Sequence, residues 1–313
     1  MAITAAMVKE LRELSGAGMM DCKRALTETN GDMDEAIDLL RKNGQMKAAK
    51  KADRIAAEGI CMTNVSEDCK LGVAVEVNAE TDFVAKNEKF QTFVAKVAET
   101  VVKSGAADMD ALMAAEWTYD ESATVADALT ALIAVIGENM KIRRFQTVKE
   151  DNGFVAAYTH MGGKIVTMID VETDVINDAV AEMGKNIAMQ CAAMKPEYCS
   201  REEVDDAFIE HEKEILLAQI MNDPKESQKP EKVIQGMIQG RIAKELKDIC
   251  LLDQIYVKAE DGKQTVQKYV DEVAKANGAN IKIKGYVRFE TGEGLEKKVE
   301  DFAAEVAAQR AKA

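Results

Sequence analysis

The sequence predicts an α+β protein with three N-terminal helices, a duplicated α+β core containing small antiparallel sheets, an inserted antiparallel helical hairpin and a C-terminal helix. Three observations carry this prediction. Apolar residues recur at helical spacing through the first fifty residues. Two later pairs of segments carry β-branched residues on alternate positions, and each pair is followed by Glu-Thr-Asp and a helical pattern. Only 3 prolines occur among 313 residues, which is typical of a chain rich in helices.

The three-helix domain, together with a basic linker, is expected at residues 1–55. Thr4 can cap its first helix, which a Ser-Gly-Ala-Gly stretch ends, and a second helix is expected over about residues 19–29. Three helices in so short a span resemble the ubiquitin-associated fold, a small module that docks peptides or proteins. We therefore expect this domain to dock a partner.

The third helix of this domain is expected to begin after Asp32, where Glu35 completes a capping box. The pair Asn43-Gly44 is expected to end it. Four basic residues then follow among alanines: Lys47, Lys50, Lys51 and Arg54. They indicate a solvated linker helix or, alternatively, a contact with an acidic partner.

The first α+β core subdomain is expected over residues 56–150. Segments 59–65 and 71–77 have the pattern of a β-hairpin, and an amphipathic helix follows through Phe90 and Val101. Two further helical patterns and a late strand complete the subdomain, at about residues 109–116, 125–138 and 142–148.

The second core subdomain, residues 151–199 plus 250–291, is expected to repeat this order. Segments 154–159 and 164–171 form its hairpin, and its late strand is expected at residues 281–290. Because Glu-Thr-Asp follows both hairpins, we align Asp82 with Asp174 and infer an internal duplication.

Residues 200–249 interrupt the second copy and predict an antiparallel helical hairpin, in which Ser200 and Glu203 form a capping-box pattern. Apolar or neutral residues recur at coiled-coil spacing on both arms, at Val204, Phe208, His211, Ile215 and Ala218 and then at Ile234, Ile238, Ile242, Leu246 and Ile249. Residues 292–313 are expected to form a C-terminal helical module, because apolar residues from Leu295 to Val306 recur at helical spacing.

Composition and charge disfavour several classes of protein. The 41 basic and 55 acidic residues give a net charge of −14, which disfavours nucleic acid or an anionic membrane as the main ligand. We find no targeting segment and no apolar stretch approaching the roughly 18 residues of a membrane span, so we expect a cytoplasmic protein. The 6 cysteines lack paired spacing and the 2 histidines stand alone, so we expect reduced thiols, no metal and no cofactor.

The sequence shows no catalytic pattern, which favours a binding protein over an enzyme. Gly162-Gly163-Lys164 lies between two expected strands and lacks a following Ser or Thr, so it predicts a hairpin turn and not a phosphate loop. Gly292-x-Gly294 lacks the third glycine of a dinucleotide-binding loop. His160 beside a turn and His211 on the helical hairpin are each explained by surface or packing roles.

The segment from Asn78 to Asn87 departs from an ordinary amphipathic pattern. Thr81 or Asp82 can cap the following helix, and Phe83 can belong to the core because it precedes Phe90 by seven residues, which is two helical turns. Alternatively, the carboxylate and the aromatic ring are displayed together at a helix start, as a wedge for a partner's pocket. The pattern alone permits both interpretations.

Several long motifs resemble the translation elongation factor Ts family. They are Val8-Lys9-Glu10-Leu11-Arg12, Gly16 to Lys23, Ala25-Leu26, Asn30-Gly31-Asp32, Thr81-Asp82-Phe83-Val84-Ala85-Lys86-Asn87, Ile136-Gly137-Glu138-Asn139, Ile142-Arg143-Arg144, Tyr158 with His160, Arg288-Phe289-Glu290 and Gly292-Glu293-Gly294. The matches follow the family's order from residue 1 to about residue 306. They are weakest at residues 104–124 and 196–263.

This resemblance implies a guanine-nucleotide exchange factor that performs no covalent chemistry. It would bind the GTPase elongation factor Tu in its GDP form and promote GDP release, so that GTP can be reloaded. In the family the Thr-Asp-Phe-Val segment displaces the GTPase's magnesium ion, and the matching residues here are Thr81, Asp82, Phe83 and Val84.

The resemblance also implies further contacts with the GTPase by Met19, Met20 and His160. From the negative net charge and the lack of a long apolar stretch we expect no direct contact with nucleic acid or membrane. The family's inserted hairpin can serve self-association, but this sequence departs from the family most there, so a homodimer is left as an open alternative. The alternative function is a peptide-binding adaptor that uses only the N-terminal three-helix domain.

Overall fold

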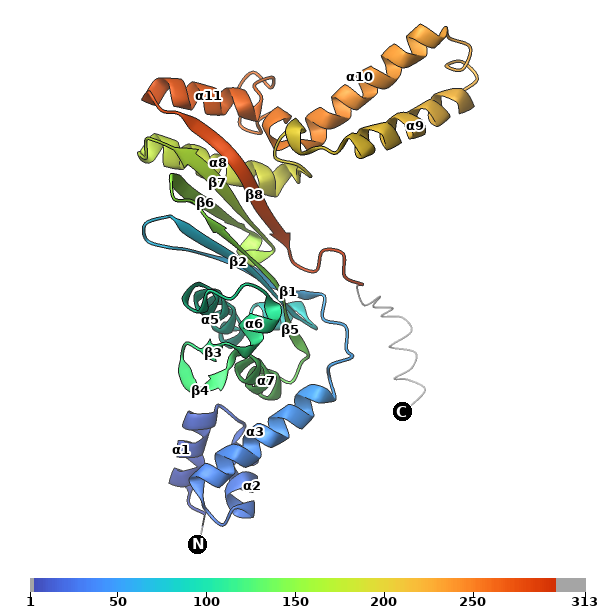
Figure 1. The fold of residues 1–313 in the computed structure, drawn as a ribbon. Helices are drawn as coiled ribbons and strands as arrows, with labels where there is room; N and C mark the ends of the chain where they lie inside the picture. The colour runs from blue at the N-terminus through green and yellow to red at the C-terminus, as the bar shows by residue number, and fades with distance from the viewer. Residues whose placement is uncertain (1–2, 297–313) are drawn as a thin grey trace.

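The structure, a computed structural model, describes residues 3–296 (Figure 1). It confirms the α+β class, with two antiparallel sheets of three strands each and a further two-stranded sheet. A two-helix arm extends from one end of the molecule, and three helices form the opposite end, where the N-terminus lies (Figure 1). Among residues 3–296, no helix has the length and apolar character needed to cross a membrane.

The N-terminal end consists of three helices, α1 (Ala5–Ser15), α2 (Met19–Glu28) and α3 (Met33–Ala49). Thr4 caps α1 by accepting a hydrogen bond from the Met7 amide at 3.3 Å, and Asp32 caps α3 by accepting one from the Glu35 amide at 2.9 Å. Both caps agree with the sequence pattern. The three helices bury one small apolar cluster, at whose centre Leu26 is fully buried.

The predicted end of the third helix at Asn43-Gly44 is wrong, because α3 continues to Ala49. Gly44 is buried where α3 packs on α7 (Val125–Ile136), and a Cβ atom on it would lie 3.5 Å from the Ala134 Cβ. The glycine therefore serves close helix packing and does not end the helix. The start of the basic segment belongs to α3, and Lys47 pairs with Asp21 of α2 at 2.9 Å.

The first sheet has the strand order β1-β2-β5 and consists of β1 (Glu58–Val65), β2 (Leu71–Ala79) and β5 (Met140–Lys149). Its apolar core is completed by α5 (Glu88–Ser104), α6 (Met109–Ala114) and α7. A short hairpin that the sequence pattern did not predict, β3 (Glu116–Trp117) with β4 (Asp120–Thr124), precedes α7. Trp117 in this hairpin stacks on Phe93 with ring centroids 5.4 Å apart, so the hairpin closes one side of the core.

The second sheet has the order β6-β7-β8 and consists of β6 (Gly153–His160), β7 (Ile165–Thr173) and β8 (Ile281–Glu290). A one-turn helix, η1 (Met161–Gly163), connects β6 to β7. Two helices pack on one face of this sheet, α8 (Asp178–Met194) and α11 (Val266–Asn277), of which the sequence pattern predicted only the first.

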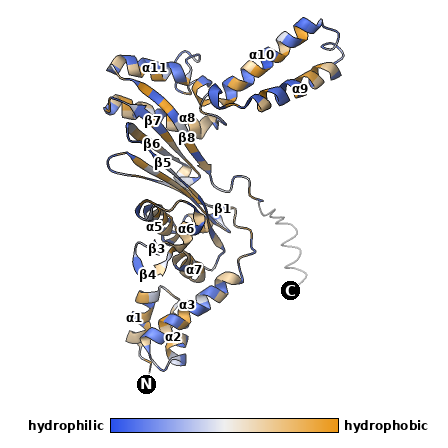
Figure 2. Cartoon of the chain, viewed as in Figure 1, coloured by the Kyte–Doolittle hydropathy of each residue, from blue (hydrophilic) through white to orange (hydrophobic). Residues whose placement is uncertain are grey.

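The two sheets pack face to face and form a third apolar cluster between them. Gly72 of β2 makes this close approach possible, because a Cβ atom there would lie 2.7 Å from Val155 Cγ1 and 2.9 Å from the Met168 sulfur. The molecule is therefore layered as helices, sheet, sheet and helices, and Figure 2 shows the apolar residues concentrated on the strands of these layers.

The internal repeat is present, but the alignment of Asp82 with Asp174 is wrong by two residues. Ala79 of β2 pairs with the first residue of β5, and Thr173 of β7 pairs with the first residue of β8. Both pairings shift register at a bulge, after Glu76 in one sheet and after Asp170 in the other. Residue 174 is therefore equivalent to residue 80. The sequence alignment failed because the second Glu-Thr lies inside a strand, whereas the first follows one.

The inserted segment forms the arm in Figure 1, an antiparallel pair of helices, α9 (Asp206–Asn222) and α10 (Glu231–Ile249). The capping box predicted at Ser200 is wrong, because a one-turn helix, η2 (Arg201–Glu203), follows that residue and Asp205 caps α9. On α10 the predicted stripe contains the buried residues Ile234 and Ile242.

The stripe predicted for α9 holds only at its start, where Val204 is buried and Phe208 is half-buried. His211 and Ile215 are exposed, and the fully buried side chain is that of Ile220. Apolar residues occur on several sides of α9, so the spacing alone selects no single face.

The chain leaves β8 through Gly292 and Gly294, both of which adopt positive φ angles, 72° in each case. The C-terminal helical module predicted at residues 292–313 lies, from residue 297 onward, outside the described residues.

Candidate partner-binding site

The Thr-Asp-Phe-Val segment forms a separate one-turn helix, α4 (Asp82–Ala85), between β2 and α5. Thr81 caps it, because its Oγ1 accepts a hydrogen bond from the Val84 amide at 3.4 Å. Asn87 then caps α5 independently. The chain therefore starts a new helix after α4, and the seven-residue spacing between the two phenylalanines does not place them on one helical face.

Phe83 is displayed and is not part of the core. Its side chain is 80% exposed, more than that of any other large apolar residue in the described chain, whereas Phe90 is fully buried. Val84 and Ala85 are buried against the first sheet and its helices. The short helix thus divides its residues, with one side anchored in the core and Phe83 presented to solvent.

Asp82 lies beside Phe83 and is ionised at neutral pH. The Lys86 Nζ lies 2.7 Å from its carboxylate, and this hydrogen bond holds the pKa of Asp82 below its usual range. The charge of Lys164, in the β6–β7 connection, acts in the same direction. The Lys86 Nζ also lies 5.9 Å from the centroid of the Phe83 ring. The site therefore presents an aromatic ring with a carboxylate and an ammonium group beside it.

His160 ends β6 close to this segment, because both α4 and the η1 turn contact β1. One of its ring nitrogens lies 3.0 Å from the Tyr158 hydroxyl. The neighbouring Met161 is 72% exposed and is not among the site residues expected from the sequence. The available signal was a large apolar residue next to two glycines in an expected turn.

Gly163 allows the turn to approach the first sheet closely. Its φ angle is 96°, and a Cβ atom there would lie 2.7 Å from the carbonyl oxygen of Cys61 in β1. The η1 turn is therefore held on the same strand as α4.

Met19 and Met20 form a second exposed apolar patch at the start of α2, with 58% and 74% of their side chains exposed. The structure does not bring them next to Phe83, because α2 lies at the N-terminal end of the molecule, beyond α7 and away from the sheets (Figure 1). A partner that contacts both patches must therefore extend from α4 past α7 to α2.

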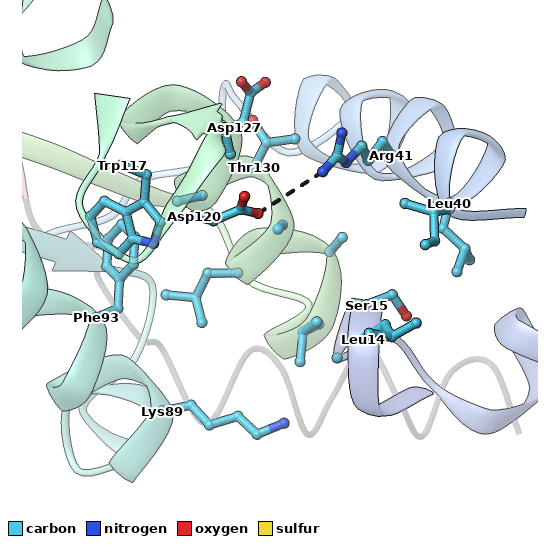
Figure 3. A pocket seen from close by; sticks show the side chains of 18 of the residues that line it. Leu14, Ser15, Leu40, Arg41, Lys89, Phe93, Trp117, Asp120, Asp127 and Thr130 are labelled. Carbon is cyan, nitrogen blue, oxygen red and sulfur yellow. Dashed lines mark ion pairs between the residues drawn. The ribbon is translucent and has the colours of Figure 1, made fainter. Parts of the chain in front are cut away.

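A cavity of about 700 Å³ separates the N-terminal helices from α5 and α7 (Figure 3). Apolar side chains such as Leu40 and Trp117 line it, and Arg41 of α3 reaches Asp120 of β4 across it at 4.0 Å. Asp120 is engaged locally, since hydrogen bonds from Ser122 lower its pKa. The cavity contains none of the predicted site residues and offers no acid–base pair.

Within residues 3–296, no three His, Cys, Asp or Glu side chains are grouped to hold a metal ion. Five of the 6 cysteines are buried, and burial raises the pKa of Cys61 and of Cys199 to about 12 in each case. The thiols of Cys61 and Cys199 are therefore protonated at neutral pH and unreactive.

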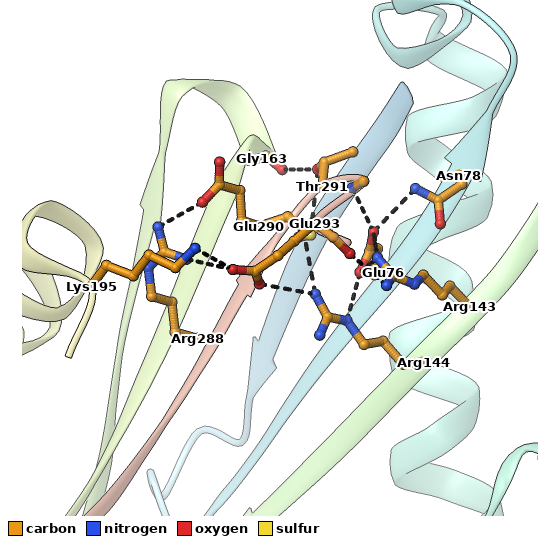
Figure 4. A network of polar contacts seen from close by, with 12 residues as sticks. Glu76, Asn78, Arg143, Arg144, Gly163, Lys195, Arg288, Glu290, Thr291 and Glu293 are labelled. Carbon is orange, nitrogen blue, oxygen red and sulfur yellow. Dashed lines mark hydrogen bonds and ion pairs between the residues drawn. The ribbon is translucent and has the colours of Figure 1, made fainter. Parts of the chain in front are cut away.

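The motifs around Arg143-Arg144, Arg288 and Glu293 take part in a polar network that joins the two sheets (Figure 4). Glu76 of β2 is fully buried and accepts hydrogen bonds from Arg143 at 3.0 Å, from Arg144 at 2.6 Å and from the Gly292 amide at 2.8 Å. Glu293 continues the network, and its carboxylate contacts Arg144, Lys195 and Arg288. These residues stabilise the packing of the two sheets.

Comparison with known proteins gives consistent matches. A family profile described as "Elongation factor TS" matches residues 80–293. Elongation factor Ts of Clostridium botulinum (strain Eklund 17B / Type B) is 49% identical over 310 residues, which cover 99% of this chain and 100% of that protein. Elongation factor Ts of Clostridium perfringens (strain SM101 / Type A) is 50% identical over 305 residues, which cover 97% of this chain and 98% of that protein. For Clostridioides difficile (strain 630) the identity is 48% over 307 residues, covering 98% of each chain.

Proposed function

Because the chain belongs to the elongation factor Ts family of translation elongation factors, we propose that it is the guanine-nucleotide exchange factor of the GTPase elongation factor Tu. It binds the GDP form of this GTPase and promotes the release of GDP, so that GTP can be loaded. The chain supplies no covalent chemistry and no cofactor, because the nucleotide and the magnesium ion belong to the partner. The place of action is then the cytoplasm, where translation occurs.

The exposure of Phe83 is the observation that carries this proposal. An isolated aromatic ring that is 80% exposed on a capped, anchored turn is suited to enter a pocket on a partner. Thr81 and Val84 hold the turn, and Asp82 and Phe83 face outward. We assign Phe83 as the wedge that disturbs the loops around the magnesium ion of the GTPase.

Exchange then follows from thermodynamic linkage. If binding of this chain and binding of magnesium with GDP oppose each other, each weakens the other by the same factor. Moving a two-state partner from 1:99 to 99:1 requires about 5.5 kcal/mol of differential binding. Burial of one aromatic side chain supplies only about 1.5–3 kcal/mol. The proposal therefore includes contacts by His160 and Met161 beside the wedge and by Met19 and Met20 on α2.

Size-exclusion chromatography with the purified GTPase tests the proposal. We expect a complex in the absence of nucleotide that GDP with Mg²⁺ dissociates. A complex that is indifferent to nucleotide contradicts exchange.

The second candidate function, a peptide-binding adaptor, is favoured by the exposure of Met19 and Met20. It predicts that replacing both methionines by alanine abolishes binding to the partner, whereas Phe83→Ala has no effect. The exchange function predicts that Phe83→Ala slows GDP release.

A further inference from the structure

The turn between α7 and β5 grips the start of the displayed segment. Both carboxylate oxygens of Glu138 contact Thr81, one accepting a hydrogen bond from its amide at 3.0 Å and the other from its hydroxyl at 2.8 Å. We propose that Glu138 is a positioning residue for nucleotide exchange, which acts by fixing the orientation of Phe83. This inference rests on the proposed function.

The hydroxyl group of Thr81 explains how the effect is transmitted. A hydroxyl has one proton and two acceptor positions. Donation of this proton to Glu138 fixes the rotation of the hydroxyl group, so that a lone pair faces the Val84 amide at 3.4 Å, and this hydrogen bond is the cap of α4. A single helical turn is unstable by itself, since its nucleation fixes several backbone angles for one hydrogen bond. Glu138 therefore helps to hold the turn that presents Phe83.

The turn that carries Glu138 is itself fastened to the core. The amide of Asn139 donates to the Glu80 carboxylate at 2.5 Å, and the side-chain amide of Asn139 donates to the carbonyl oxygens of Ala52 and Arg54 at 3.2 and 2.8 Å. Asn139 is largely buried. Asn139 thus connects the end of β2, the start of β5 and the segment after α3, next to the turn that presents Phe83.

The second repeat provides an internal comparison. At the equivalent corner, the carboxylate of Asp174 accepts hydrogen bonds from the backbone amide and the side-chain amide of Asn280, at 2.8 and 2.6 Å. Val175 stands where the first repeat has Thr81, so no hydroxyl is present, and no short helix precedes α8. Both repeats therefore close this corner with an acid–amide contact. The two hydrogen bonds from Thr81 to Glu138 are an addition in the first repeat, which displays the aromatic ring.

A double-mutant cycle separates positioning from ordinary stabilisation. In the full chain, we expect Glu138→Ala to slow catalysed GDP release by about tenfold, the order expected for loss of a hydrogen bond to a charged group. In a Phe83→Ala background the same substitution should change the rate less than twofold, because residues that act through one another are not additive. Glu138→Gln should recover most of the rate, since its amide keeps one acceptor and one donor for Thr81.

A measurement on the chain alone checks the geometry without the GTPase. Hydrogen exchange at the Val84 amide should become at least about tenfold faster in Glu138→Ala, because its acceptor is no longer held in place. Asp174→Ala is the matched control, because it removes two hydrogen bonds at the equivalent corner. It should leave both the Val84 amide and the GDP release rate unchanged.

The outcomes distinguish the inference from the function on which it rests. If Glu138→Ala slows release equally in both backgrounds, or leaves the Val84 amide protected, Glu138 does not position Phe83, although the exchange function stands. If Phe83→Ala alone leaves exchange unchanged, the proposed function fails and the role of Glu138 in exchange fails with it. If Glu138→Ala does not fold, Thr81→Val tests the same link, and it should reproduce the loss of rate and the unprotected Val84 amide.

Discussion

Replacing Phe83 by alanine tests whether its ring is a displayed wedge or part of the core. The side chain is 80% exposed, so its removal leaves almost no cavity in the protein. We expect the free energy of unfolding to change by no more than about 0.5 kcal/mol, which is typical of surface substitutions. A buried aromatic residue would instead lose about 3–5 kcal/mol.

The effect on function should be large, because the ring is expected to become buried only in the complex. Loss of about 1.5–3 kcal/mol of transfer free energy corresponds to a reduction of about 10- to 140-fold in the rate of catalysed GDP release. The rate can be followed by displacement of a fluorescent GDP analogue from elongation factor Tu at limiting concentrations of the exchange factor. Unfolding in urea, monitored by the tryptophan fluorescence, gives the stability.

Phe90→Ala is the matched control, because Phe90 lies seven residues away and is fully buried. We expect this variant to lose about 3–5 kcal/mol of stability. The reasoning is refuted if Phe83→Ala exchanges nucleotide at the normal rate, or if it is destabilised as strongly as Phe90→Ala.

Three further predictions follow from the core and the arm. Glu76→Ala should cost about 3–5 kcal/mol in urea unfolding, because it leaves Arg143 and Arg144 without their buried partner; a cost below 1 kcal/mol would contradict this role. Burial, and then the neighbouring Glu150, raise the pKa of Asp170 to about 6. The folded state therefore binds this proton more tightly than the unfolded state, and the stability falls as the pH rises from about 4 to about 6. Asp170→Asn should flatten that slope and stabilise the protein at pH 7 by about 1 kcal/mol, a value reduced for its partial exposure; an unchanged slope would show that another group titrates. Finally, replacing residues 205–248 by a short glycine–serine linker should preserve one cooperative unfolding transition, because Tyr198 and Cys250 form a β-bridge at the base of the arm. Loss of cooperativity would show that the arm is part of the core.

Local signals in the sequence predicted the elements that local interactions determine. The caps at Thr4 and Asp32 and the late strand at residues 281–290 agree with the structure because each depends on a few neighbouring residues. The end placed at Gly44 was wrong because glycine also permits close packing, and only the position of α7 shows which use applies. Along α9, apolar residues on several sides left the buried face undetermined until α10 was placed against it.

The displayed segment shows the same limit within the candidate site. The sequence located it through its unusual residues but left the exposure of Phe83 undecided, since the spacing to Phe90 assumed one continuous helix. The cap at Asn87 divides that helix in two. The contact between Glu138 and Thr81 had no sequence signal, because the two residues are far apart in the chain and meet only when β5 pairs with β2.

The position of the η1 turn beside the wedge is fixed by both repeats, which bears on how the chain can oppose nucleotide binding. Thr291, just beyond β8, donates its amide to the Lys164 carbonyl oxygen at 2.9 Å and its hydroxyl to that of Gly163 at 3.2 Å, so it holds the turn that bears Met161. The next residue, Gly292, donates its amide to the buried Glu76 carboxylate. Phe83 and Met161 are thus presented by elements that are tied to the same sheet, and little freedom is lost when they bind. One ring supplies less than the required differential binding of about 5.5 kcal/mol, so two preorganised contacts contribute more to binding than two mobile ones. Weakening the contacts that hold α4 or the η1 turn on the sheet should therefore lower the exchange rate more than it lowers stability.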